Sequence, residues 1–78
     1  MKPTEYVKIL GNHIGDHRRK QGLTQQQLAD GLGWSLRKIT SYERGERVPP
    51  LTEAVQLATA LETTIDELWI FGISFGAK

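Results

Sequence analysis

The sequence predicts an all-α fold, a compact bundle of five short helices followed by a short extended C-terminal tail. Apolar residues recur three and four positions apart along most of the chain, which is the spacing of one helix face. Capping residues and glycines divide this pattern into short segments. Alternating apolarity, which is typical of strands, does not occur before the last ten residues. The 78 residues are expected to form one domain, 1–78.

The first helix is expected over residues 5–21, with Thr4 as its N-cap. Its inward stripe comprises Tyr6, Leu10, His13, Ile14 and His17. Gly22 is expected to end it, because glycine adopts the left-handed conformation at little cost. The last turn carries three cations, residues 18–20, where the helix dipole favours positive charge.

The second helix is expected over residues 25–32. Thr24 and Gln27 match a capping box, in which a Thr hydroxyl and a Gln side chain each satisfy a backbone N–H at the helix start. Gly33 is expected to end this helix. Its inward residues are Leu28, Ala29 and Leu32.

The third helix is expected to run from a Ser35 cap to about Arg44, where Gly45 closes it. Two short helices joined by so tight a turn have the layout of a helix-turn-helix, with its core at about 24–44. Trp34 in the turn either packs on the core or lies exposed, and packing is favoured. Inward residues of the third helix are Ile39 and Tyr42, and outward residues are Leu36, Arg37, Thr40, Ser41 and Arg44, with Lys38 at their flank.

Two more helices complete the bundle. Pro49 and Pro50 suit a connection and the first turn of a fourth helix. Its apolar face comprises Val55, Leu57, Ala58 and Leu61. Thr64 and Glu67 match a second capping box, which opens a fifth helix. Its apolar residues are Ile65, Leu68 and Trp69.

Composition and charge narrow the class of protein. The chain is 38% hydrophobic and 24% charged, as in globular proteins, and without cysteine it has neither disulfides nor thiolate metal sites. No signal peptide or membrane-spanning run is visible, so the protein is expected in the cytoplasm. The formal charge is +1, but residues 17–50 hold seven Lys or Arg against three Asp or Glu, a net +4, whereas residues 51–78 sum to −3. This asymmetry favours one face for a polyanion.

Several short blocks, each weak alone, form a specific signal through their order and spacing. They are Gly22-Leu23-Thr24-Gln25, Leu28-Ala29, Gly33, Ser35, Ile39, Tyr42-Glu43-Arg44-Gly45 and Ile65-Asp66-Glu67-Leu68. With them the chain resembles the phage-repressor and Cro-like (Xre-type) helix-turn-helix family of DNA-binding regulators. The resemblance implies a lambda-repressor-like domain whose helix 35–44 enters the major groove of DNA.

The resemblance also implies roles for single residues. Positions matching Leu36, Arg37 and Ser41 commonly touch bases in this family, and Thr40 shares their outward face. Arg37 is the best candidate for guanine, because its guanidinium can bond O6 and N7 together. Leu36 suits a thymine methyl group, and Ser41 suits several bases. Phosphate contacts are expected from Gln25, Lys38, Arg44 and Arg47.

Other positions invite comparison with the family. An Arg late in the first helix often pairs with a Glu late in the third, so Arg18 and Glu43 are expected to form a partly buried ion pair. His17 stands where the family usually has a large apolar residue, and a packed, hydrogen-bonded histidine is expected there. His13 lies four residues earlier, but no third ligand is suggested and no metal or other cofactor is expected. Glu62 stands where the family often has glycine, which puts the local turn geometry in question.

The tail, about residues 70–78, continues an apolar alternation that begins at the end of the fifth helix. The alternating residues are Trp69, Phe71, Ile73 and Phe75. So much aromatic surface favours a homodimer contact over the alternative, packing on the first helix near Tyr6.

The sequence therefore predicts a sequence-specific DNA-binding transcriptional regulator, a repressor acting as a homodimer on a near-palindromic operator in double-stranded DNA. The alternative is an antitoxin or accessory module that binds a protein partner through the same scaffold. No catalytic constellation is apparent, so an enzyme is not expected.

Overall fold

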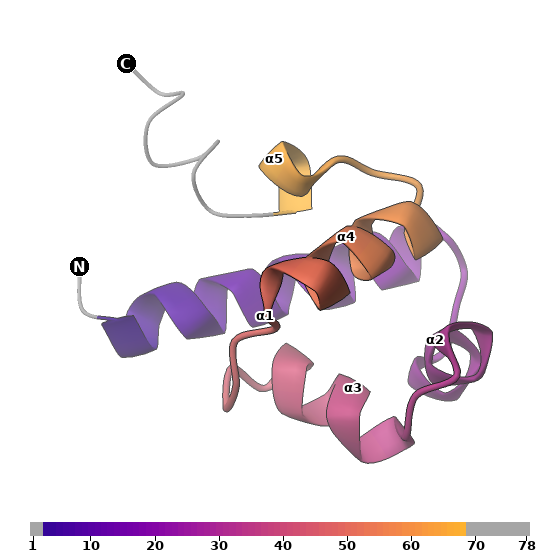
Figure 1. Cartoon of the computed structure of the whole chain (residues 1–78), viewed down its shortest axis with the longest axis horizontal. Coiled ribbons are helices and arrows are strands. Elements are labelled where there is room, and N and C mark those ends of the chain that lie inside the picture. Colours follow the sequence, from indigo (N-terminus) through magenta and orange to yellow (C-terminus); the bar gives the residue numbers. More distant parts are fainter. Residues whose placement is uncertain (1–2, 69–78) are drawn as a thin grey trace.

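The computed structural model describes residues 3–68, which form five α-helices joined by short connections (Figure 1). The helices are α1 (Pro3–Lys20), α2 (Gln25–Leu32), α3 (Leu36–Glu43), α4 (Leu51–Ala60) and α5 (Ile65–Leu68). Residues 3–68 contain no strand, and the expected all-α class is confirmed. The expected C-terminal tail and Trp69 lie outside the described residues. None of the described helices combines the length and apolarity that crossing a membrane requires.

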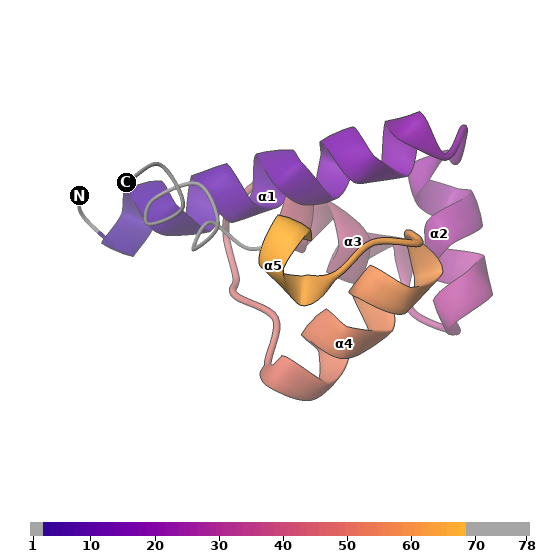
Figure 2. The same ribbon diagram turned by 90° about the horizontal axis from the view of Figure 1, so that it is seen from above.

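The other four helices lie to one side of the long first helix (Figure 2). α1 runs the length of the molecule, α2 lies at the end where α1 finishes, and α3, α4 and α5 lie alongside (Figures 1 and 2). α1 packs against α3 and α5, α2 packs against α3 and α4, and α4 packs against α5. The largest fully buried side chains are Tyr42, Ile14, Ile39, Leu57, Leu61 and Leu68. Each such aliphatic side chain stabilises the fold by about 1.5–3 kcal/mol relative to an exposed one.

The helix ends of the central motif follow the predicted capping residues. The Thr24 hydroxyl accepts from the Gln27 N–H at 3.0 Å, and the Gln27 side chain accepts from the Thr24 N–H at 2.8 Å, so the capping box is present. Gly33 takes the left-handed conformation at φ 74° and ends α2. The Ser35 hydroxyl caps α3 by accepting from the Lys38 N–H at 3.2 Å. These contacts fix both ends of the turn between α2 and α3.

Two expectations about the outer helices, the Thr4 cap and the inward Val55, are wrong, and that for Pro49 and Pro50 holds in part. α1 begins at Pro3, so Thr4 lies within the helix; proline suits the first helical position because its missing N–H has no partner to lose there. α4 begins after Pro50, which caps it without a side-chain hydrogen bond. Val55 is 46% exposed and Ala54 is buried in its place. Position 54, unlike 55, is three and four residues from the buried residues 57 and 58, so it shares their face.

The second capping box forms only in part. The Thr64 hydroxyl accepts from the Glu67 N–H at 3.1 Å, as expected. The Glu67 carboxylate, however, accepts from the Thr63 hydroxyl at 2.9 Å. The Glu67 carboxylate thus bonds the Thr63 hydroxyl and not the Thr64 backbone N–H that a complete capping box requires.

The turn between α4 and α5 places a glutamate in a glycine conformation. Glu62 has φ 55°, the left-handed region that side chains other than glycine enter at a cost. Its N–H bonds the Thr59 carbonyl at 3.2 Å, and the Thr63 N–H bonds the Ala58 carbonyl at 2.9 Å. This pair of bonds is a Schellman motif, which requires a left-handed residue at position 62.

A glycine sets the distance between α1 and α3. A Cβ atom at Gly11 would lie 2.5 Å from the Tyr42 carbonyl oxygen and 2.6 Å from that of Glu43. Both atoms belong to the backbone at the C-terminal end of α3, so neither can move aside alone. The absence of a side chain at Gly11 therefore lets α1 approach α3 and position it.

Candidate nucleic-acid interface

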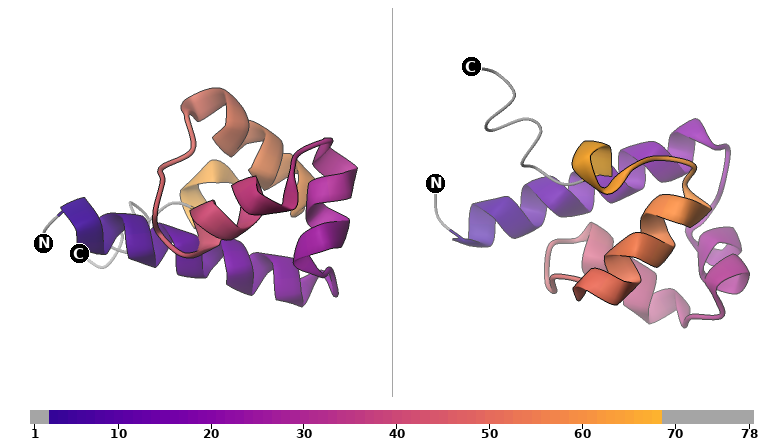
Figure 3. Two further views of the ribbon diagram at one scale, coloured as in Figure 1. Left: turned by 90° about the horizontal axis from the view of Figure 1, so that it is seen from below. Right: turned by 45° about the horizontal axis from the view of Figure 1, so that its top comes forward.

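α3 has one face in the core and another directed outward. Ile39 and Tyr42 are fully buried, whereas Leu36 is 41% exposed and Arg37 is exposed. The view from below shows α3 in front of the bundle (Figure 3, left). α3 therefore presents its N-terminal residues on an open surface of the described structure.

Two residues expected on the outward face are less available. Ser41 lines the same pocket as Arg37 but is only 9% exposed, so it is less accessible than its expected outward placement implies. It lies beside Tyr42 on the helix, and its carbonyl accepts from the Glu46 N–H at 3.0 Å, which brings the chain after α3 back over it. Thr40 is half-buried, and its hydroxyl donates to the Arg37 carbonyl at 3.0 Å.

A pocket of about 420 Å³ opens between α3 and the loop that follows it. It is lined by Ser35, Arg37, Lys38, Ser41, Glu46 and Arg47. Three cations face one carboxylate, so the pocket has an excess of positive charge. Arg44, the C-cap of α3, is also exposed. Guanidinium groups in this arrangement suit phosphate oxygens and the acceptor edge of guanine.

Lys38, which is expected at a phosphate, has partners within the protein in this structure. Its Nζ lies 2.5 Å from Oε2 of Glu53 on α4 and 4.6 Å from the centroid of the Trp34 ring. The Lys38 side chain is 27% exposed. Sequence reasoning missed this partner, because Glu53 is 15 residues away and at the start of α4 looks like an ordinary dipole-favoured acid.

Glu53 also joins the core to this contact. The Tyr42 hydroxyl donates to Glu53 Oε1. Hydrogen bonds from Lys38 and then Tyr42 lower the pKa of the Glu53 carboxyl, so it is ionised at neutral pH. Burial, followed by the Glu53 contact, raises the pKa of Tyr42 to about 12.

The aromatic rings of Trp34 and Tyr42 lie beneath the cations of Lys38 and Arg47. Trp34 packs against the core and meets Tyr42 edge to face, with ring centroids 6.1 Å apart, so the favoured packing of Trp34 is confirmed. The Arg47 guanidinium carbon lies 5.7 Å from the Tyr42 ring centroid. The cations at 38 and 47 are thus both placed by aromatic rings.

The expected Arg18 and Glu43 ion pair is present. Arg18 Nε donates to Glu43 Oε2 at 2.7 Å, and the two side chains are 10% and 9% exposed. Arg18 Nη1 donates to the Leu23 carbonyl at 2.7 Å. Gln25 Nε2 donates to Glu43 Oε1 at 3.0 Å, so the Gln25 amide expected at a phosphate is engaged within the protein. The carboxylate thereby ties α1 and α2 to α3.

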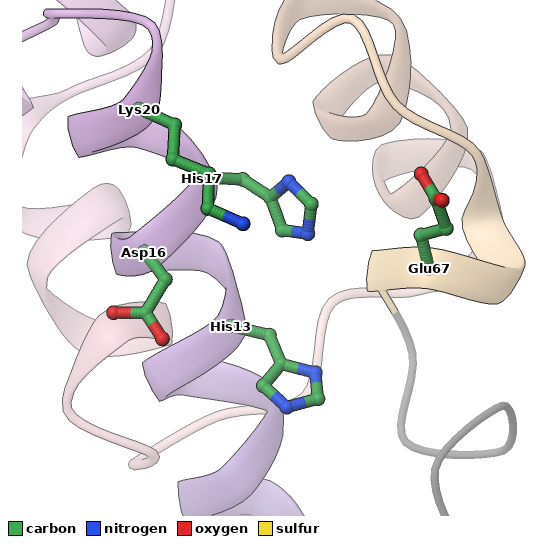
Figure 4. A pocket seen from close by; sticks show the side chains of 5 residues that line it. All are labelled: His13, Asp16, His17, Lys20 and Glu67. Atoms are coloured by element: carbon green, nitrogen blue, oxygen red, sulfur yellow. The ribbon is translucent and has the colours of Figure 1, made fainter.

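A second pocket, of about 230 Å³, lies between α1 and α5. His13 and His17 point toward the side of α5 that carries Glu67, and Asp16 and Lys20 complete the lining (Figure 4). The hydrogen bond expected at His17 occurs one turn earlier, where His13 Nδ1 lies 3.2 Å from the Leu68 carbonyl oxygen. No three His, Asp or Glu side chains of residues 3–68 are grouped so that they could hold a metal ion.

The chain is similar in sequence to known helix-turn-helix regulators. A family model described as "Helix-turn-helix" matches residues 14–68. The "Cryptic phage CTXphi transcriptional repressor RstR" of Vibrio cholerae serotype O1 is 42% identical over 55 residues, covering 70% of this chain and 49% of RstR. "Control protein C.SmaI" of Serratia marcescens is 36% identical over 61 residues, covering 78% of this chain and 73% of that protein. The chain thus spans about half the length of RstR.

Solved structures show the same architecture. The crystal structure of the restriction-modification controller protein C.AhdI from Aeromonas hydrophila superposes with a TM-score of 0.81 at 29% identity, covering 88% of this chain and all of that one. The DNA-binding domain of BldD superposes with a TM-score of 0.78 at 30% identity, covering 88% of this chain and 99% of that one.

Proposed function

The chain belongs to the helix-turn-helix family of DNA-binding regulators, and from this membership we propose that it is a sequence-specific transcriptional repressor that binds its operator as a homodimer. The observation that carries the proposal is the outward face of α3, where exposed Leu36 and Arg37 lie beside a pocket with excess positive charge. The proposed site of action is the cytoplasm, and no catalytic activity is proposed. The whole chain is proposed to act as one domain.

The proposed roles divide base readers from phosphate contacts. Arg37 reads guanine through its guanidinium, and Leu36 contacts a thymine methyl group. Thr40 and Ser41 make secondary base contacts, limited by their burial. Arg44 and Arg47 bind phosphates, and the Gln25 backbone N–H adds a phosphate contact at the start of α2.

The base-reading role has a direct test. Selection from random DNA at a fixed salt concentration supplies the preferred site, and affinities are then measured for that site and for random DNA. Arg37→Ala should lower affinity for the preferred site by about 1–3 kcal/mol and relax selectivity at one base pair. Arg47→Ala, the matched control, should weaken binding to both DNAs alike and lower the salt dependence. An equal loss on both DNAs for Arg37→Ala would remove the base-reader assignment.

The homodimer has a separate test. Support comes from the aromatic residues 69–75, which lie outside the described structure, and from the geometry of operators, whose half-sites lie about 34 Å apart. Sedimentation should show a dimer for the full chain and a monomer for a chain ending at Leu68, and the selected site should be symmetric. A monomeric full chain with an asymmetric site would contradict the dimer. Capture of a stoichiometric protein partner without salt-dependent DNA affinity would favour the antitoxin or accessory alternative instead.

A further inference from the structure

Lys38 has a carboxylate partner within residues 3–68, whereas Arg37 and Arg47, which line the same pocket, have none there. The Arg37 side chain is exposed, and no hydrogen bond or ion pair of that side chain occurs within residues 3–68. Lys38, by contrast, has a carboxylate oxygen at 2.5 Å and an indole ring beneath its ammonium at 4.6 Å. One cation of the pocket is therefore already neutralised by the protein.

The carboxylate that neutralises Lys38 is itself fixed in place. Glu53 is on the first turn of α4, and its side chain is 21% exposed. Its second oxygen accepts from the hydroxyl of Tyr42, which is fully buried. Because the two oxygens have different donors, the carboxylate cannot turn toward one without losing the other.

We propose that Glu53 restrains Lys38 from the DNA backbone, and that this restraint limits sequence-independent affinity and so sharpens the choice of operator. The inference rests on the proposed DNA binding and assigns a specificity role to a residue of α4. Glu53 is a positioning residue, since it acts through Lys38 and not by touching DNA.

The physical argument concerns competition for one ammonium. A phosphate that recruits Lys38 must displace a carboxylate already in contact and must also separate the ammonium from the Trp34 ring. The carboxylate is partly shielded from water, so salt screens this pair less than an exposed pair. Phosphate contacts from lysine strengthen binding to every sequence alike. Withholding Lys38 thus weakens binding to random DNA without removing any base reader.

The first test removes the ammonium. Each lysine that neutralises a phosphate adds about 0.9 to the slope of log affinity against log salt concentration. If Lys38 is withheld, Lys38→Met should leave that slope on random DNA unchanged. A slope that falls by about 0.9 would show that Lys38 already binds phosphate, and would overturn the proposal.

The second test releases the ammonium. Glu53→Gln keeps an oxygen that can accept from Tyr42 but no longer holds a charge for Lys38. The expected result is a severalfold gain in affinity for random DNA, a slope steeper by about 0.9, and a smaller ratio of operator to random affinity. Thermal unfolding confirms that the variant is folded at the assay temperature.

Two controls separate release of Lys38 from simple loss of a negative charge. Glu46→Gln removes a carboxylate from the same pocket, and residues 3–68 contain no ion pair of Glu46 to break, so the slope should change little. The double variant Lys38→Met with Glu53→Gln should lose the gain in slope. A gain that persists in the double variant, or an unchanged slope in Glu53→Gln, would overturn the proposal.

Failure of the proposed DNA binding gives a different experimental result from failure of the restraint by Glu53. A wild-type chain without salt-dependent affinity for any DNA would remove both proposals together. A wild-type chain that selects an operator, combined with a phosphate-bound Lys38, would remove only the restraint by Glu53.

Discussion

Glu43 accepts hydrogen bonds from two other helices at once. Arg18 of α1 and Gln25 of α2 both donate to its carboxylate, which is almost completely shielded from water. Removing the acceptor leaves a buried guanidinium without its counter-charge. Such orphaned charges cost far more than the pair contributes when it is complete.

We expect Glu43→Ala to lower the free energy of unfolding by about 3–5 kcal/mol, measured by urea denaturation. Asp16→Ala is the matched control, because it also breaks an arginine pair, with Arg19 at 2.6 Å, but both side chains are about 60% exposed. Exposed pairs contribute about 0–1 kcal/mol. Equal losses in the two variants would contradict the structural role of Glu43.

Glu62 destabilises the fold through its backbone conformation, whereas Glu43 stabilises it. Its left-handed conformation is required by the Schellman motif and disfavoured by its Cβ atom. Glu62→Gly should therefore raise the free energy of unfolding by up to about 1 kcal/mol in the same urea assay. Glu62→Ala keeps the Cβ atom and should give no gain. If Glu62→Ala raised the free energy of unfolding as much as Glu62→Gly, the destabilisation would come from the glutamate side chain and not from the backbone conformation.

α1 and α3 are in close contact at a glycine. A methyl group at Gly11 would meet two backbone carbonyls of α3, so Gly11→Ala should destabilise the protein by at least about 1–3 kcal/mol, seen as a lower Tm. At Gly31, within α2, a methyl group would meet nothing within 4 Å, and Gly31→Ala should raise stability by about 0.5–1 kcal/mol. A gain in both variants would show that helix propensity decides the effect at position 11, and would contradict the close approach of α1 to α3.

Local sequence patterns predict the helices better than they predict side-chain partners. α2 was predicted at its observed bounds, because Thr24, Gln27 and Gly33 act on neighbours only a few residues away. The ion pair of Arg18 was anticipated only through the family resemblance. The contact between Lys38 and Glu53 depends on how α4 crosses α3, which no local pattern encodes.

The same limit explains why two side chains differ from expectation in their exposure. Helical spacing predicts Ser41 on the outward side of α3, where it does line the pocket, but the chain at Glu46 folds back and leaves it only 9% exposed. Val55 was placed inward because it is apolar, although the neighbouring Ala54 has the buried position. Helical spacing gives the direction in which a side chain leaves its own helix. It does not show which other segment of the chain packs against that side chain.

For the whole molecule, the charge asymmetry of the sequence is altered by folding. The acidic C-terminal segment is not entirely turned away from the basic middle, because Glu53 reaches across to Lys38. Arg18 and Glu43 also neutralise each other. The positive field near α3 therefore depends mainly on Arg37, Arg44 and Arg47, among the described residues.

Global stability should also depend on alkaline pH through Tyr42. Its pKa is raised from 10.0 to about 12, so the native state favours the neutral phenol. The resulting stabilisation is complete below pH 10 and is lost as pH rises from about 10 to about 12. Urea unfolding at several pH values should show a steeper decline for the wild type than for Tyr42→Phe. Because lysines titrate in the same range, the difference between the two proteins is the relevant quantity, and parallel curves would contradict the shift.

The separation of the two faces of α3 has an evolutionary consequence. Ile39, Tyr42 and Glu43 fix the helix in the fold, whereas the exposed side chains of Leu36 and Arg37 make no ion pair or hydrogen bond within residues 3–68. Substitutions at such surface positions usually change stability by no more than about 0.5 kcal/mol. A lineage can therefore exchange its proposed base readers, and diverge toward a new operator, while the scaffold that presents them stays the same.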